Sequence, residues 1–154
     1  MSEPLFRWAE LDPASGADVM LIRKTYGTLE LFLFSAAGWH PHRIHFDQPY
    51  ATGVEGHEAV VVHGPLQAVN AVDALLDALD VPVTVRSLTY RHRALLTVGQ
   101  EAAVTARVKS VEEDGSTATF EVWMERAGDG EHTTTVVATV ATSTMPTAGA
   151  ASAR

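Results

Sequence analysis

The sequence predicts an α+β domain in which an antiparallel sheet wraps around one long, largely buried helix. Two observations lead to this prediction: an apolar helical pattern over residues 64–79, and four successive segments of alternating apolar and polar residues after residue 83. A helix that is apolar over most of its circumference must be covered by other parts of the chain, and alternating strands offer an apolar face that can cover it. We therefore expect a single domain over residues 1–145 and a disordered tail over residues 146–154, where small and polar residues predominate.

Short elements are expected before the central helix. Residues 5–11 have the composition of a first strand, which residues 19–22 extend beyond a turn rich in Asp, Pro, Ser and Gly. Asp47 is expected to cap a single helical turn that Gly53 ends, and this role makes Asp47 a structural residue.

A further helix is predicted from residue 28, where Thr28 can act as its cap. Apolar residues recur at helical spacing after this threonine, and Gly38 offers an end to the helix. The same spacing predicts that Phe32 and Phe34 pack in the core.

The central helix has clear start and stop signals. Gly64 and Pro65 suit its first positions, and Val81 before Pro82 ends it, because a residue that precedes proline is pushed out of the helical region. Its polar residues follow one another at spacings of three and four and leave the wider remaining surface apolar; they are Gln67, Asn70, Asp73, Asp77 and Asp80.

The second half of the chain reads as strands. Residues 83–96 are rich in β-branched side chains, and residues 102–111 alternate between apolar and polar. Asp114-Gly115 predicts a hairpin into a further alternating strand, and Gly128-Asp129-Gly130 turns the chain into a last strand over residues 133–144.

Composition disfavours several classes of protein. Hydrophobic residues make up 46% of the 154 residues and charged residues 19%, which is ordinary for a globular chain. The formal net charge of −8 disfavours nucleic-acid binding, which needs clustered Lys and Arg. The N-terminus lacks the pattern of a secretory signal, no apolar run approaches the roughly 20 residues that span a bilayer, and no cysteine is present for a disulfide. We therefore expect a cytoplasmic protein without a nucleic-acid or membrane partner.

Five of the seven histidines lie between residues 34 and 66. Because imidazole titrates near neutrality, such a cluster indicates proton transfer or metal binding. His40, His42 and His45 follow one another closely, but Pro41 favours an extended or turn geometry over a helix. With no cysteine and no HExxH pattern, a metal site would need His or carboxylate ligands gathered from elsewhere.

Acid–base chemistry is the interpretation we favour for these histidines. Histidines that only cap or hydrogen-bond a turn are the alternative. We expect neither a metal nor a cofactor.

Three motifs extend this interpretation: FSAAGWHPHRIHFDQPYA, then VEG, and then VVHGPL. Together they resemble the MaoC-like hydratases, and especially their branch of 3-hydroxyacyl thioester dehydratases and mesaconyl-CoA hydratases. The resemblance covers about residues 28–125, and the motifs together are more specific than each alone. It implies the hot-dog fold and the reversible syn addition of water to a trans-2-enoyl thioester.

The resemblance also implies site residues. His45 matches a catalytic histidine, and His40 stands where the family has Asp or Asn. His45 is the candidate general base and acid, with His40 as its paired group, although two close imidazoliums would repel each other. The N–H group of Gly64, at a helix N-terminus, suits the thioester oxygen, or it only begins the helix. His63 precedes this glycine and is expected either to contact the substrate or to shape the turn.

Arg91 and Arg93 share one face of a predicted strand by the period-2 rule. In an acidic chain, a local basic spot of this kind predicts contact with the phosphates of coenzyme A or of an acyl carrier protein. A solvated strand face is the alternative.

Two functional hypotheses follow. The first is an acyl-thioester hydratase or dehydratase acting on acyl-CoA or acyl-ACP. The second is a non-catalytic acyl-thioester-binding or partner subunit of a paired hot-dog assembly, because His40 replaces the usual acid or amide. A hot-dog thioesterase is a weaker alternative, since no added carboxylate or serine motif favours it. In either case we expect a homodimer or a pair with a homologous hot-dog subunit, which would cover the edge strands and the apolar face.

Overall fold

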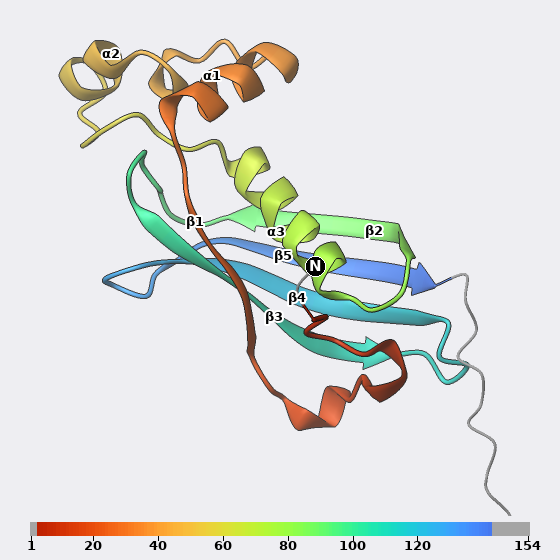
Figure 1. The fold of residues 1–154 in the computed structure, drawn as a ribbon. Coiled ribbons are helices and arrows are strands. Elements are labelled where there is room, and N and C mark those ends of the chain that lie inside the picture. The colour runs from red at the N-terminus through yellow and green to blue at the C-terminus, as the bar shows by residue number, and fades with distance from the viewer. Residues whose placement is uncertain (1–2, 143–154) are drawn as a thin grey trace, which may run out of the picture.

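The computed structural model describes residues 3–142 and shows a five-stranded antiparallel sheet packed on helix α3, Gly64–Ala78 (Figure 1). The strand order is β1-β3-β4-β5-β2. The strands are β1 Val19–Thr25, β2 Val83–His92, β3 Glu101–Val111, β4 Thr117–Arg126 and β5 His132–Thr142. The predicted α+β architecture is confirmed, whereas the tail predicted over residues 146–154 lies outside the described residues.

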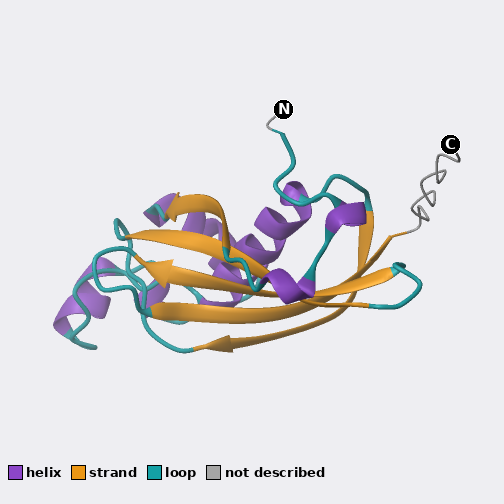
Figure 2. Ribbon diagram, turned by 90° about the horizontal axis from the view of Figure 1, so that it is seen from below, coloured by secondary structure: helices purple, strands orange, loops and turns teal. Residues whose placement is uncertain are grey.

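The core lies between α3 and one face of the sheet, and Figure 2 shows α3 on that side. Alternate residues of the three central strands point to α3 and are fully buried, among them Val104, Ala106, Phe120, Val122, Val136, Ala138 and Val140. This arrangement follows from the period-2 pattern, because every second side chain of a strand lies on the same face.

Helix α3 begins as predicted and ends within one residue of its expected end, with Leu79 as its C-cap. Two of its side chains differ from the predicted pattern. Gln67 is fully buried, and its Oε1 accepts hydrogen bonds from the hydroxyls of Thr133 at 2.7 Å and Thr134 at 3.1 Å. Val69, expected on the apolar surface, is 46% exposed.

The predicted turns between the later strands are present. Gly115, Gly128 and Gly130 have φ values of 67°, 103° and 71°. Only glycine adopts such conformations readily. These glycines therefore define where β4 begins, where it ends, and where the chain turns toward β5.

The strand predicted over residues 5–11 was wrong. Leu5 and Phe6 donate their backbone N–H groups to the carbonyl of Ala78, and Trp8–Glu10 forms one turn of 3-10 helix. The indole N–H of Trp8 donates to the carbonyl of Gly115 at 2.8 Å. The apolar residues of this segment therefore cover the C-terminal end of α3 instead of pairing in the sheet, and the first strand is β1.

Helices α1, Thr28–Ala37, and α2, Gln48–Gly53, lie together beyond one end of the sheet (Figure 1). Gly27 is the N-cap of α1, so Thr28 is its first residue and not its cap, whereas Gly38 ends the helix as predicted. Asp47 caps α2 as predicted, because its carboxylate accepts from the N–H of Tyr50 at 3.1 Å. No helix within residues 3–142 is long and apolar enough to cross a membrane.

The buried side of α1 differs from the predicted one. Leu31 and Ser35 are buried, and Phe34 packs partly buried against the core, as expected. Phe32 is 54% exposed, so its predicted place in the core was wrong. The reason is the position of α1 beyond the sheet, where only one narrow side of the helix meets the rest of the domain.

Candidate active site

His45 is held by the backbone of a buried segment. Its Nδ1 lies 2.8 Å from the carbonyl oxygen of Val61, and the N–H of Val61 donates in turn to the carbonyl of Ile44 at 2.9 Å. A carbonyl can only accept, so Nδ1 of His45 carries the proton. In the neutral imidazole, Nε2 is therefore the unprotonated, basic nitrogen.

The surroundings of His45 keep it neutral near pH 7. Partial burial lowers the pKa of His45 below its ordinary 6.5, and the nearby His42, His40 and His57 lower it further. The hydrogen bond to the carbonyl of Val61 acts in the opposite direction. A neutral imidazole with a free Nε2 can accept a proton from water.

His63 contacts His45 directly. Their rings stack with centroids 3.7 Å apart and planes at 19°, and the His63 side chain is buried. Its Nε2 lies 2.9 Å from the hydroxyl of Ser35, whereas its Nδ1 has no hydrogen-bond partner among residues 3–142. Burial lowers the pKa of His63 to about 4, with smaller contributions from His45 and His40, so this ring is also neutral near pH 7.

His40 also contacts His63. Its ring centroid is 5.9 Å from that of His63 and 5.9 Å from that of Phe34, and its backbone N–H donates to the carbonyl of Ser35 at 2.9 Å. His63 therefore contacts both of the histidines predicted as a catalytic pair. Within the described part of the chain, no three His, Asp or Glu side chains form a group that could hold a metal ion.

Gly64 begins the first turn of α3 directly after His63. The N–H groups of a first helical turn have no acceptor within their helix, and the helix dipole is positive there. The ring of His92, at the end of β2, lies directly against Gly64: a Cβ on this residue would lie 3.0 Å from Cγ of His92. Nδ1 of His92 lies 3.3 Å from the hydroxyl of Thr134, and burial lowers the pKa of His92.

Arg91 and Arg93 lie on the opposite face of the sheet from α3. Nε of Arg93 donates to the hydroxyl of Thr135 at 3.2 Å, and Arg93 lines a hollow of about 290 Å³ there with Arg107 and Trp123. The structure thus separates the two arginines from His63 and Gly64. Their contact with a carrier phosphate stays a prediction.

The sequence interpretation missed three residues that contact the predicted ones. Val61 orients His45, Ser35 bonds to His63, and His92 packs on Gly64. A signal existed for all three: Ser35 and Val61 lie within the motifs FSAAGWHPHRIHFDQPYA and VVHGPL, and strand alternation places His92 on the face opposite to Arg91 and Arg93.

Comparison with known proteins gives matches to hydratases and dehydratases of acyl thioesters. The sequence model of a family described as hydroxyacyl-thioester dehydratase type 2 matches residues 13–98, which is more than half of the 154-residue chain. A mesaconyl-C(4)-CoA hydratase from Chloroflexus aurantiacus is 59% identical over 39 residues, which are 25% of this chain and 14% of that protein. The chain thus matches only a small part of the length of that relative.

Solved structures support the fold. An (R)-hydratase from A. caviae involved in PHA biosynthesis superposes with a TM-score of 0.75 at 22% identity, covering 86% of this chain and 98% of that chain. A 3R-hydroxyacyl-ACP dehydratase complex from Mycobacterium tuberculosis has a TM-score of 0.65 at 16% identity, covering 81% of this chain and 96% of that chain. The hot-dog fold expected from the motifs is confirmed. Together with the match over residues 13–98, this places the chain in the hydroxyacyl-thioester dehydratase type 2 family, a family of acyl-thioester hydratases and dehydratases.

Proposed function

We propose that the chain catalyses the reversible syn hydration of a trans-2-enoyl thioester, carried by coenzyme A or an acyl carrier protein, to a 3-hydroxyacyl thioester. One observation carries this proposal. A neutral imidazole, His45, is fixed by a backbone carbonyl with its basic nitrogen unprotonated, and it stacks on the residue that precedes the first turn of α3. The family, and the hydratases to which the chain is similar, support the same class of reaction.

The reaction balances with His45 as the carrier of the proton. Nε2 of His45 takes a proton from water while the water oxygen bonds to the β-carbon of the enoyl group. The electron pair of the double bond moves toward the thioester oxygen, which accepts a hydrogen bond from the N–H of Gly64. Nε2 then returns the proton to the α-carbon on the same face, and His45 is neutral again.

Two effects are expected to lower the barrier. A positioned acid–base group contributes roughly 100-fold to 10,000-fold, and a donor to the developing oxyanion contributes roughly 100-fold to 1,000-fold. His40 would assist His45 as a second proton-binding group or as a hydrogen-bond partner. A carboxylate at position 40 would stabilise the imidazolium of His45, which a second imidazole does not do.

The test is the loss of conjugated-enoyl absorbance when the purified protein meets a panel of trans-2-enoyl-CoA esters. His45→Ala should lower turnover by about 100-fold to 10,000-fold and leave the fold intact. His42→Ala is the matched control, because His42 is exposed in the same loop with its ring centroid 6.1 Å from that of His45. This control should retain turnover within about tenfold.

His40→Asp separates the enzyme from the non-catalytic alternative. If the proposed reaction is correct, this substitution preserves or raises turnover and changes the pH profile. If the wild type binds acyl-CoA without hydrating any ester and His40→Asp gains hydration, the wild-type chain is a binding or partner subunit. Equal turnover of His45→Ala and wild type would refute the role of His45.

A further inference from the structure

We propose that the hydroxyl of Thr134 is the junction of a hydrogen-bonded chain that positions the N–H of Gly64 for the thioester oxygen. The chain runs from the ring of His92 on β2, through Thr134 on β5, to the side chain of Gln67 on α3. This inference rests on the proposed function, since it adds a positioning residue to the same reaction. Thr134 acts through Gly64 and is not itself a catalytic residue.

Thr134 is fully buried and meets both partners in the chain. It pairs with His92 across β2 and β5, and its Oγ1 lies 3.3 Å from Nδ1 of His92. The same hydroxyl donates to Oε1 of Gln67 at 3.1 Å. A hydroxyl has a single hydrogen, so toward His92 its oxygen accepts, and Nδ1 of His92 carries the proton. The Thr134 hydroxyl therefore fixes the tautomer of His92 as well as the place of its ring.

Both ends of the chain hold the first turn of α3. At one end the ring of His92 packs on Gly64, with its Cγ 3.0 Å from the position that a Cβ of Gly64 would occupy. At the other end Gln67 belongs to this turn, and its backbone N–H donates to the carbonyl of His63 at 3.1 Å. A shift at either end therefore changes the direction of the Gly64 N–H.

A register shift in the sheet creates the junction. The pairing of β4 with β5 shifts after Met124, which leaves Thr133 as an extra residue of β5. Consecutive residues of a regular strand face opposite sides of the sheet, yet the hydroxyls of Thr133 and Thr134 both donate to Gln67. Shifts of this kind re-aim side chains and are frequent beside active sites.

Gln67 is a costly residue for the core. Its Nε2 is buried and has no hydrogen-bond partner among residues 3–142. An apolar side chain of similar size would fill this place without leaving a polar atom unpaired. The packing of the core thus gives no reason for a glutamine here, whereas the anchoring of Thr134 does.

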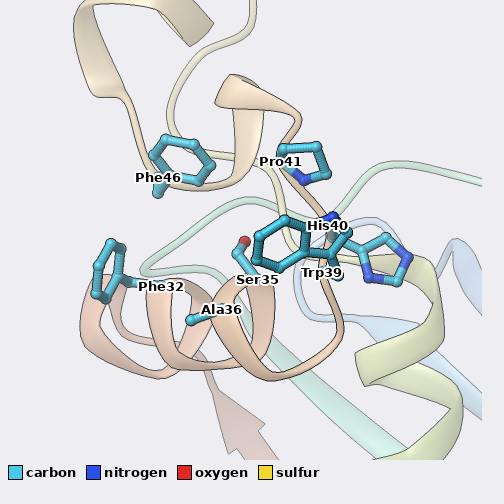
Figure 3. Close-up of a pocket in the computed structure, with 7 residues that line it drawn as sticks. All are labelled: Phe32, Ser35, Ala36, Trp39, His40, Pro41 and Phe46. Atoms are coloured by element: carbon cyan, nitrogen blue, oxygen red, sulfur yellow. The ribbon is translucent and has the colours of Figure 1, made fainter.

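A separate set of contacts holds the proposed base. Ser35 projects from α1 and His40 from the turn after it (Figure 3). Both contact His63, which stacks on His45. These contacts come from α1 and its following turn, whereas the chain through Thr134 comes from β2 and β5. Loss of the Thr134 hydroxyl should therefore disturb the oxyanion donor and leave the base in place.

Thr134→Val tests this role, because valine keeps the shape of threonine without its hydroxyl. With a trans-2-enoyl-CoA ester that the wild type hydrates, kcat should fall roughly 10-fold to 100-fold with little change in KM. Thr134→Ser keeps the hydroxyl and should restore most of the turnover. Thr119→Val is the matched control: it breaks the 3.0 Å contact between the hydroxyls of Thr119 and Thr139 on the other face of the sheet, and kcat should stay unchanged. An unchanged kcat in Thr134→Val, or an equal loss in Thr119→Val, would overturn the proposal.

His92→Phe tests the same bond from its other end and does not depend on the folding of Thr134→Val. It keeps a ring on Gly64, removes the hydrogen bond, and should lower kcat as Thr134→Val does. The double variant should lose no more than either single variant, because both break one bond. An unchanged kcat in His92→Phe, or additive losses in the double variant, would contradict the chain.

Nuclear magnetic resonance gives a readout without turnover. The side-chain nitrogen shifts of wild-type His92 should show the proton on Nδ1, and butyryl-CoA, which has no double bond to hydrate, should shift the amide proton of Gly64. Thr134→Val should lose this tautomer and most of the Gly64 shift, and Thr119→Val should keep both.

The outcomes separate the two proposals. If the wild type hydrates no ester but shows this resonance pattern, the positioning chain stands and the hydratase proposal fails. If the wild type hydrates an ester and Thr134→Val leaves the Gly64 shift unchanged, the hydratase proposal stands and the positioning chain fails. A His92 proton on Nε2, or a Gly64 amide that does not respond to butyryl-CoA in the wild type, would also overturn the chain.

Discussion

The imidazole of His63 is an unusual core residue, because burial leaves its Nδ1 without a hydrogen-bond partner among residues 3–142. An unsatisfied buried polar group costs about 1–3 kcal/mol. His63 contacts the rings of both His40 and His45. Its position therefore suggests that it orients His45 at the expense of stability.

His63 also makes the stability of the protein depend on pH. Its pKa is about 4 in the folded protein and near 6.5 when exposed, so below pH 6.5 the unfolded chain binds the proton more readily. The free energy of unfolding should therefore fall as the pH drops from about 6.5 to about 4, by roughly 3 kcal/mol from this residue. Above pH 6.5 the contribution is fully present.

His63→Gln removes the titrating group and should remove this part of the acid sensitivity. The measurement is urea unfolding at about pH 7 and about pH 5. His42→Gln is the control, since His42 is exposed, and it should lose as much stability on acidification as wild type does. If His63→Gln shows the same acid loss as wild type, His63 is not the residue responsible.

At the scale of elements, the site forms where α3 meets the end of β2. A Cβ on Gly64 would lie 3.0 Å from Cγ, 3.2 Å from Cβ and 3.2 Å from Nδ1 of His92. Because real Cβ atoms are rarely this close to other atoms, one of the two elements must move if position 64 carries a side chain. Glycine is thus required here by the packing of His92 and not by a left-handed backbone.

Gly64→Ala should accordingly destabilise the protein by about 1–3 kcal/mol, as overpacking does. In the double variant Gly64→Ala with His92→Ala, the ring is absent and this loss should largely disappear. Denaturation midpoints of wild type, both single variants and the double variant measure the coupling. Strictly additive effects would show that the two residues do not constrain each other.

At the scale of the whole molecule, β2 is an edge strand with apolar residues in water. Val85, Leu88 and Tyr90 are 37%, 43% and 48% exposed, and they lie on the side of the sheet that faces α3. Uncovered edges tend to pair with another strand. For this chain we expect a homodimer or a pair with a homologous subunit, which would cover this edge.

Leu88→Lys should weaken this association, because it places a charge in the apolar part of the edge. Thr89→Lys is the control on the same strand, since residue 89 is exposed on the opposite face. Sedimentation at micromolar concentration should give a dimer mass for wild type and the control, and a smaller mass for Leu88→Lys. A wild-type chain that is monomeric at that concentration, and that no homologous subunit binds, would contradict the expected assembly.

Local signals in the sequence determined most of the secondary structure. The Gly64-Pro65 start of α3, the Asp47 cap of α2 and the glycine turns around β4 all depend on neighbouring residues, and the structure confirms them. The same applies to the alternation of the strands that cover α3. The motifs around His45 and Gly64 also led to the correct family and fold.

Only the tertiary structure decided which faces and which partners these elements use. The apolar spacing of residues 5–11 does not reveal that this segment covers the end of α3. The spacing within α1 does not reveal that this helix lies beyond the sheet. Ser35 meets His63, Val61 meets His45, and His92 meets Gly64 across 28, 16 and 28 positions of sequence. Periodicity describes which residues share a side of one element, whereas contacts between elements depend on how the whole chain packs.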